Sequence, residues 1–202
     1  MSRIETVNPA QATGQAKELL DGVKAKLGMT PNLMRVMANS PAVLDAYLKF
    51  SGALSEGELS APTREQIALT VGQANSCDYC LSAHTAIAKM NGLSADQIRA
   101  ARLASSSDAK TNAILVFASQ LIQKRGFVSD ADITAAREAG VTDAEFAEVI
   151  ANAALNILTN YFNHVAQTAI DFPAAEKITS GPPTESPANA QSCHSDACSL
   201  AS

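Results

Sequence analysis

The sequence predicts an all-α fold of about nine helices. Apolar residues recur three and four positions apart along almost the whole chain, a spacing that places them on one face of a helix. The strict alternation that marks a strand is nearly absent. Residues typical of helix starts, and glycines typical of helix ends, separate the periodic segments. The short connections between segments favour antiparallel neighbours.

The first three predicted helices are amphipathic segments near the N-terminus. The first ends at a glycine, and the second and third each begin at a proline, which fits the first turn of a helix. A serine before the third is a suitable N-cap. The ranges are 15–28, 31–40 and 41–54.

The next two predicted helices contain most of the residues that could carry chemistry. They cover 61–74 and 77–92, and the stretch GQANS spans the end of the first and the short connection to the second. We take Ser76 as the N-cap of the second helix, which makes Cys77 its first helical residue. An Asn-Gly pair ends that helix.

Four more helices complete the predicted fold. One ends in basic residues followed by glycine, as expected at the C-terminal end of a helix dipole. The last opens with a capping box from Thr142 to Glu145 and ends before Pro173. The ranges are 94–104, 108–126, 129–140 and 142–172.

The composition changes near the C-terminus, where Pro, Ser, Ala and Asn dominate. Such a stretch has little to bury and is expected to stay mobile. We therefore expect a helical domain over residues 1–175 and a flexible Pro/Ser-rich tail over 176–202. The tail carries a second cysteine pair, Cys193 and Cys198.

Charge and hydropathy exclude several classes of protein. The chain has 202 residues, enough for one domain with a hydrophobic core, and a net charge of -5. This acidic balance argues against nucleic-acid binding and against a polybasic membrane patch. No apolar run approaches the roughly 18 residues of a membrane span, and the first residues lack the apolar core of a signal peptide. We expect a cytoplasmic protein.

Composition also bears on assembly and on the cysteines. Hydrophobic residues make up 47% of the chain and charged residues only 17%, below the usual quarter. Because buried subunit faces are depleted in charge, this favours a homo-oligomer. Four cysteines in a cytoplasmic chain argue against a disulfide scaffold, so their spacing must distinguish catalytic, metal-binding and inert thiols.

The stretch VGQANSCDYCLSAH combines two cysteines and a histidine on one helix face. Cys77, Cys80 and His84 are three and four residues apart, so they form one stripe. Free N–H groups and the helix dipole favour a thiolate in the first turn. His84 can reach Cys80 and either accept its proton or stabilise its anion. Two cysteines spaced in this way at a helix start can close a disulfide with little backbone movement.

Glu65 is a fourth candidate, twelve residues before Cys77 on the preceding predicted helix. On one unbroken helix that separation would be about 18 Å, too long for proton transfer. A turn at GQANS would fold the two helices together and bring the carboxylate to the thiol stripe. There it could orient His84 or relay a proton through water.

Each of these residues also has a plainer interpretation. The cysteine pair could be half a metal site or incidental, the histidine a core residue, and the glutamate a surface charge. The CHSDAC stretch at 193–198 could be a tail with chance ligands, a second dithiol that passes electrons to the first, or a soft-metal site. A site completed by Cys77 and Cys80 would offer four thiolates, a common structural zinc set.

The spacing of Glu65, Cys77, Cys80 and His84 resembles the signature of the AhpD-like alkylhydroperoxidases of the carboxymuconolactone decarboxylase family. The stretch PTREQIALTVGQANSCDYCLSAHTAIAKMNGLS resembles the core helix pair of that family. NILTNYFNHVAQTAID resembles its last long helix. The resemblance covers roughly residues 30–172.

The resemblance implies an all-helical fold assembled as trimers or hexamers. It implies peroxide reduction by the dithiol. We expect no bound cofactor, and we expect an external dithiol or disulfide reductase as electron donor. Carried over by position, Cys80 would be the peroxidatic cysteine and Cys77 the resolving one, with His84 and Glu65 as the proton relay. The residues alone leave the choice of cysteine open, because Cys77 has the better position on the helix dipole. AhpD itself has a histidine where this chain has Tyr79.

Two functional hypotheses follow. The first is a thiol-dependent hydroperoxide reductase that uses the Cys77–Cys80 dithiol. The second is a metal-binding or redox-sensing module that uses these thiols together with Cys193 and Cys198. The lactone decarboxylase branch is a weaker match, because decarboxylation has no use for a dithiol.

Overall fold

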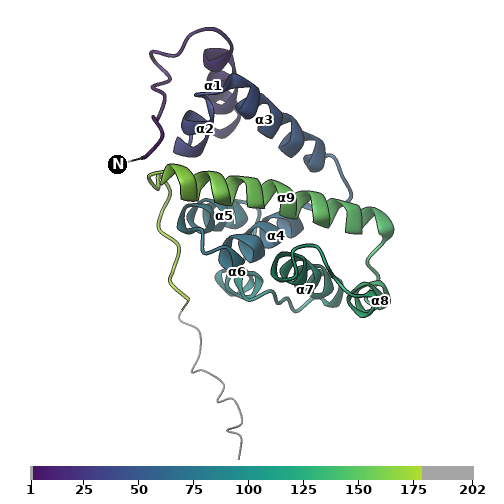
Figure 1. Ribbon diagram of the computed structural model, residues 1–202. Coiled ribbons are helices and arrows are strands. Elements are labelled where there is room, and N and C mark those ends of the chain that lie inside the picture. The colour runs from purple at the N-terminus through teal and green to yellow at the C-terminus, as the bar shows by residue number, and fades with distance from the viewer. Residues whose placement is uncertain (1, 179–202) are drawn as a thin grey trace, which may run out of the picture.

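The computed structural model describes residues 2–178, and within that range the chain forms nine α-helices and no strand (Figure 1). The predicted all-α fold is confirmed. The helices are α1 (Gly14–Leu27), α2 (Asn32–Met37), α3 (Pro41–Ser55), α4 (Ala61–Ala74), α5 (Asp78–Met90), α6 (Ala95–Arg102), α7 (Ala109–Gln123), α8 (Asp130–Glu138) and α9 (Asp143–Ala166). None of these helices is both long and apolar enough to cross a membrane.

Local sequence accounts for most helix boundaries. The predicted capping box of Thr142 and Glu145 forms at the start of α9, and Ser94 and Ser129 make equivalent boxes at α6 and α8. The prediction is wrong at the end of the last helix, which stops at Ala166 rather than continuing to Phe172. Gln167 turns into the left-handed region with φ of 50°, which ends the helix.

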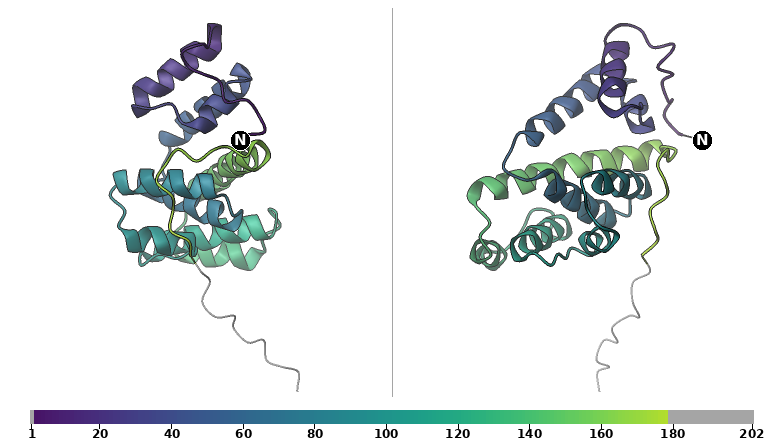
Figure 2. Two further views of the ribbon diagram at one scale, coloured as in Figure 1. Left: turned by 90° about the vertical axis from the view of Figure 1, so that its left-hand side faces the viewer. Right: turned by 180° about the vertical axis from the view of Figure 1, so that it is seen from behind.

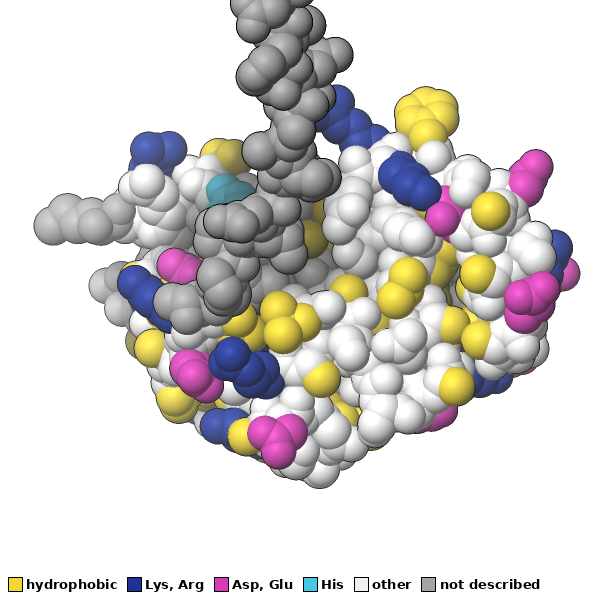
Figure 3. Space-filling view, turned by 90° about the horizontal axis from the view of Figure 1, so that it is seen from below, with side chains coloured by type: hydrophobic (Ala, Val, Ile, Leu, Met, Phe, Trp, Pro, Cys, Tyr) yellow, Lys and Arg dark blue, Asp and Glu magenta, His cyan; other side chains and the backbone are white. Residues whose placement is uncertain are grey.

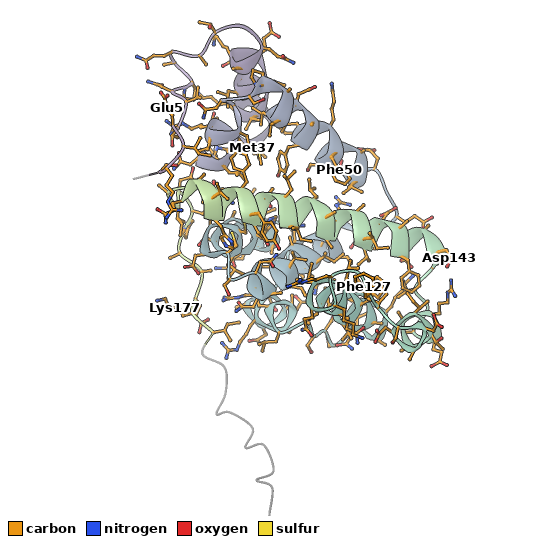
Figure 4. The ribbon with its side chains drawn as sticks, viewed as in Figure 1. Glu5, Met37, Phe50, Phe127, Asp143 and Lys177 are labelled. Atoms are coloured by element: carbon orange, nitrogen blue, oxygen red, sulfur yellow. The ribbon has the colours of Figure 1, made fainter. Side chains whose placement is uncertain are left out.

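Helix α9 is the central element of the fold (Figures 1 and 2). It lies between α1, α2 and α3 on one side and α4 to α8 on the other. It contacts α2 and α3 across the first boundary and α4, α5 and α7 across the second. Met37 of α2, labelled in Figure 4, lies next to α9 and is 1% exposed.

Two hydrophobic clusters fill the spaces on either side of α9. The larger one lies among α4 to α9 and includes Phe117, whose ring packs edge-on against Phe146 with centroids 5.0 Å apart. The smaller one joins α1, α2 and α3 to the start of α5, and it contains both Cys77 and Cys80. The cysteine pair therefore lies in a packed core between two parts of the fold.

The residues after α9 return across α5 and α6, and we call residues 168–178 the C-terminal strap. The Asp171 carboxylate accepts a hydrogen bond from the backbone N–H of Asn32 at 2.7 Å. Further along, Arg102 donates to the carbonyl of Glu176 at 2.6 Å. Figure 4 shows Lys177 at the far end of the strap from α9. The domain division at residue 175 stays a prediction, and the second cysteine pair lies outside the described residues.

Figure 3 shows the molecule from below, and hydrophobic side chains lie scattered among polar ones on this face, with charged groups of both signs at its margin. Phe127, between α7 and α8, is 87% exposed. Scattered apolar side chains of this kind are ordinary for a protein surface.

The contrast between two phenylalanines tests the assignment of the larger core. Phe117 is 2% exposed, so Phe117→Ala should lower the free energy of unfolding by about 3–5 kcal/mol. Phe127→Ala removes the same side chain from the surface and should change it by less than about 0.5 kcal/mol. Urea denaturation followed by circular dichroism measures both. Equal losses in the two variants would contradict this description of the core.

Candidate functional site

A tight turn between α4 and α5 positions the cysteine pair. Ser76 takes the left-handed conformation with φ of 54°, and the backbone N–H of Cys77 donates to the carbonyl of Gly72 at 2.9 Å. The chain thereby reverses, and α5 packs along α4 as the GQANS stretch led us to expect. The predicted N-cap is wrong by one residue: Cys77, not Ser76, caps α5, because Ser76 is used to make the turn.

The two thiols lie in direct contact. The Cys77 sulfur accepts a hydrogen bond from the backbone N–H of Cys80 at 3.4 Å, as an N-cap side chain does. The two sulfurs are 2.6 Å apart, and the Cys77 thiol donates to the Cys80 sulfur. Both cysteines are free, with exposed fractions of 1% for Cys77 and 3% for Cys80. The expected closeness of the pair is therefore present in the structure.

The electrostatic environment makes the two cysteines unequal. The pKa of Cys80 is lowered to about 6, chiefly by the hydrogen bond from Cys77, against the opposing effect of burial. The charge of His84 and the amides of Asn163 and Asn160 act in the same direction as Cys77. The pKa of Cys77 is raised, first by its hydrogen bond to Cys80 and then by burial. The arrangement favours a Cys80 thiolate beside a protonated Cys77 thiol.

His84 and Glu65 form an ion pair between α5 and α4. His84 Nδ1 lies 2.8 Å from Glu65 Oε2, and their side chains are only 22% and 16% exposed. Burial opposes a charged imidazole, but the Glu65 carboxylate more than offsets it, so the pKa of His84 is raised. Among the described residues, His84 makes no hydrogen bond to Cys80, and it acts on the thiol through its positive charge.

An apolar cavity of 260 Å³ opens onto this group, and Cys80 and His84 both line its wall. Most of the other lining residues are apolar or aromatic, including Met34, Tyr47 and Phe172. Glu65 lines a smaller cavity of 80 Å³. The side chains of Tyr47, His84 and Thr159 line both cavities, so His84 lies at the boundary between them.

Tyr79, between the two cysteines, has a structural contact on a different helix. Its hydroxyl accepts a hydrogen bond from the backbone N–H of Leu33 at 3.1 Å, and its ring packs edge-on against Phe172 with centroids 5.8 Å apart. Burial raises the pKa of Tyr79. Tyr79 thus ties α2 and the C-terminal strap to α5 and stays a neutral phenol at neutral pH.

Sequence analysis missed functional candidates on α9. Asn163 Nδ2 donates to the Cys80 sulfur at 3.3 Å, and Asn160, three residues earlier, is fully buried. Tyr47 of α3 also lines the cavity, and burial, Glu65 and Cys80 raise its pKa to about 12. The available signal was a run of asparagines on the core face of a long helix, since buried amides need partners.

The second hypothesis depends on residues that the structure does not describe. Between residues 2 and 178, no group of three or more His, Cys, Asp or Glu side chains is arranged to hold a metal ion. A four-thiolate site would need Cys193 and Cys198, which lie outside that range.

Comparison with known proteins supports the resemblance in the sequence. Residues 41–123 match the model of the carboxymuconolactone decarboxylase family. A search of curated protein sequences found no match.

Solved structures share the fold over most of the chain. An uncharacterized peroxidase-related protein from Ralstonia eutropha JMP134, described as an alkylhydroperoxidase AhpD core, is 28% identical with a TM-score of 0.75, over 84% of this chain and 92% of that one. A peroxidase-related protein from Silicibacter sp. TM1040 is 22% identical with a TM-score of 0.72, over 84% and 94%.

The debrominase Bmp8, solved in complex with 2,3,4-tribromopyrrole, is 20% identical with a TM-score of 0.71, over 85% of this chain and 94% of that one. At 22% and 20% identity, the Silicibacter protein and Bmp8 show the shared fold alone. The family match and the fold together confirm the resemblance: the chain carries a carboxymuconolactone decarboxylase family segment within an AhpD-like helical fold.

Proposed function

We propose that the protein is a thiol-dependent hydroperoxide reductase in which Cys80 is the nucleophile. The observation that carries the proposal is the unequal cysteine pair. Cys80 lines an apolar cavity and has a pKa lowered to about 6. The Cys77 sulfur lies 2.6 Å from the Cys80 sulfur and is a protonated thiol. A thiolate that can be reached from a cavity, with a second thiol beside it, suits a two-step redox cycle.

The first step cleaves the peroxide. The Cys80 thiolate attacks the terminal oxygen of ROOH, an S–O bond forms, the O–O bond breaks, and the alkoxide leaves. The raised pKa of His84 favours the imidazolium, which gives the alkoxide its proton and yields ROH. Glu65, 2.8 Å from His84, holds the ring and its charge in position. The apolar cavity of 260 Å³ suits a small organic R group.

The second step restores the pair. Cys77 attacks the sulfenic sulfur of Cys80, which forms the disulfide and releases water. An external dithiol or disulfide reductase then reduces that disulfide by thiol exchange. The reducing cytoplasm, where we propose the protein acts, maintains such donors.

Single replacements of the two cysteines test their roles. Cys80→Ser should abolish turnover of cumene hydroperoxide with dithiothreitol as reductant. Cys77→Ser should allow one oxidation of Cys80 to sulfenic acid, trapped by dimedone and detected by mass spectrometry, because the resolving thiol is missing. If Cys77→Ser blocks the first oxidation and Cys80→Ser does not, the two roles are reversed.

The pH dependence of turnover tests the relay. The Cys80 pKa of about 6 places the acid limb near pH 6, since the thiolate is lost below it. The alkaline limb should follow the raised pKa of His84, because the imidazolium is lost above it. His84→Ala should move the acid limb upward and remove the alkaline limb, and Glu65→Gln should lower the alkaline limb.

Matched surface variants serve as controls for the relay. His164 and Glu138 are exposed residues of the same types, so His164→Ala and Glu138→Gln should leave both limbs in place. A His84→Ala profile that overlays the wild type would mean that His84 only packs, and the relay would be abandoned.

We also propose that the protein works as a homo-oligomer. Exposed apolar side chains of α9, spaced so that they share one face, offer a surface for a second copy; they are Ile150, Leu158, Tyr161 and Val165, with exposed fractions of 44–63%. Together with the low charge of the chain, this supports a buried subunit face.

Light scattering at micromolar concentration should give a mass several times 21.0 kDa. The double variant Tyr161→Glu/Val165→Glu should reduce it, because a charged interface loses its apolar contact. If the wild-type protein has the mass of a single chain, the oligomer is refuted. If the double variant keeps the wild-type mass, the interface lies elsewhere on the surface.

A further inference from the structure

Two buried amides of α9 lie beside the nucleophilic sulfur: Asn163 donates to it, and Asn160 also acts to lower the pKa of Cys80. Asn163 Nδ2 lies 3.3 Å from Cys80 Sγ, and Asn163 is 5% exposed. Asn160 lies three residues earlier on the same helix face and is 0% exposed. Its Oδ1 accepts a hydrogen bond from Asn75 Nδ2 at 2.8 Å, which leaves its own Nδ2 free to point elsewhere.

The free amide group of Asn160 is the unusual feature. Its Nδ2 is buried and has no hydrogen-bond acceptor among the residues that the structure describes. Buried donors of this kind are rare, because they give up bonds to water and receive none in return. A group that becomes a strong hydrogen-bond acceptor only in one protonation state would account for this buried donor. Cys80 is such a group, because its sulfur accepts strongly only as a thiolate.

We propose that Asn160 and Asn163 form a thiolate cradle that stabilises the anion of Cys80 and thereby sets the reduction potential of the Cys77–Cys80 pair. The inference rests on the redox role of this pair in the proposed function. It adds residues from a third helix to the reaction. These residues would affect the reduction of the Cys77–Cys80 disulfide as well as the attack of Cys80 on the peroxide.

The physical basis is the difference between an anionic and a neutral sulfur as a hydrogen-bond acceptor. Cys80 is 3% exposed, so water cannot solvate its charge and protein donors must replace it. An amide N–H donates a stronger hydrogen bond to a thiolate anion than to the sulfur of a neutral thiol or of a disulfide. The cradle therefore favours the thiolate over both the protonated thiol and the disulfide.

The reset reaction shows what this preference does. An external dithiol and the Cys77–Cys80 disulfide give a Cys77 thiol, a Cys80 thiolate, one proton and the oxidised donor. Two electrons pass from the donor to the pair. Because the cradle stabilises a product, it raises the reduction potential of the pair and makes the disulfide easier to reduce.

The cradle differs from the other groups around Cys80 because it carries no charge. Several titratable or charged groups face the site from other elements, directly or through a neighbour; they are Lys26 of α1, Tyr47 of α3, Glu65 of α4, Cys77, Tyr79 and His84 of α5, and Asp171 of the C-terminal strap. Amides do not titrate. Removing them changes the affinity for the anion while every other charge stays in place.

The first measurement is the pH dependence of alkylation of Cys80 by iodoacetamide, followed on its peptide by mass spectrometry. In Asn163→Leu and Asn160→Leu the Cys80 pKa should rise by about one unit, so alkylation below pH 6 should slow about tenfold. Asn163→Gln keeps an amide donor and should recover part of the rate. Asn163→Asp keeps the shape but replaces the donor with a carboxylate, and it should raise the pKa most.

The second measurement is the equilibrium of the pair with glutathione at pH 8. The Leu variants should shift it toward the disulfide by about tenfold, which corresponds to a potential about 30 mV lower for a two-electron couple. Asn156→Leu is the control, because Asn156 is also buried on α9 but donates to the carbonyl of Asn152 at 2.8 Å. It should leave the Cys80 pKa and the potential at their wild-type values.

The outcomes separate this inference from the proposed function, because neither measurement uses a peroxide. Shifts in both quantities in a protein without peroxidase turnover would support the cradle and refute the peroxidase. Wild-type values in folded Asn160→Leu and Asn163→Leu would overturn the cradle, as would equal shifts in Asn156→Leu. If the Leu variants fail to fold, Asn163→Asp decides, and an unchanged Cys80 pKa in that variant overturns the cradle.

Discussion

The burial of the Cys80 thiolate is the constraint around which the site is organised. A sulfur that is 3% exposed is cut off from water, so its charge must be solvated by groups of the protein. The Cys77 thiol, the Asn163 amide and the charge of His84 meet this need from two helices. The turn between α4 and α5 brings Glu65 to His84, so a third helix supports the positive charge.

The buried face of α9, at the centre of the fold, carries a strip of polar side chains among apolar ones. Its core side carries amides that bond to the sulfur, to Asn75 and to its own backbone. The Nδ2 of Asn160 and the Oδ1 of Asn163 have no partner among the described residues. Each such atom costs about 1–3 kcal/mol of stability. Apolar clusters on both sides of α9 offset that cost, so the fold tolerates a polar strip beside Cys80.

Both ends of the described chain hold the two parts of the fold together around the cavity. The backbone N–H of Arg3 donates to the carbonyl of Ala166 at 2.6 Å, at the end of α9. The C-terminal strap binds α2 through Asp171 and supplies Phe172 to the cavity wall. Since α1 and α2 also line that cavity, these contacts fix its shape as well as the packing of the helices.

The sequence by itself determined the features that depend on local spacing: the all-α fold, the capping box of α9, and the shared face of Cys77, Cys80 and His84, because helical periodicity is a property of neighbours in the chain. Only the tertiary structure decided which cysteine has the lowered pKa. The hydrogen bond from the Cys77 thiol lowers that pKa most, and Asn163 and Asn160, some eighty residues from Cys80 along the chain, lower it further. The N-cap of α5 and the early end of α9 were not visible in the sequence, because Ser76 and Gln167 take the left-handed conformation that glycine or asparagine usually supplies at such positions.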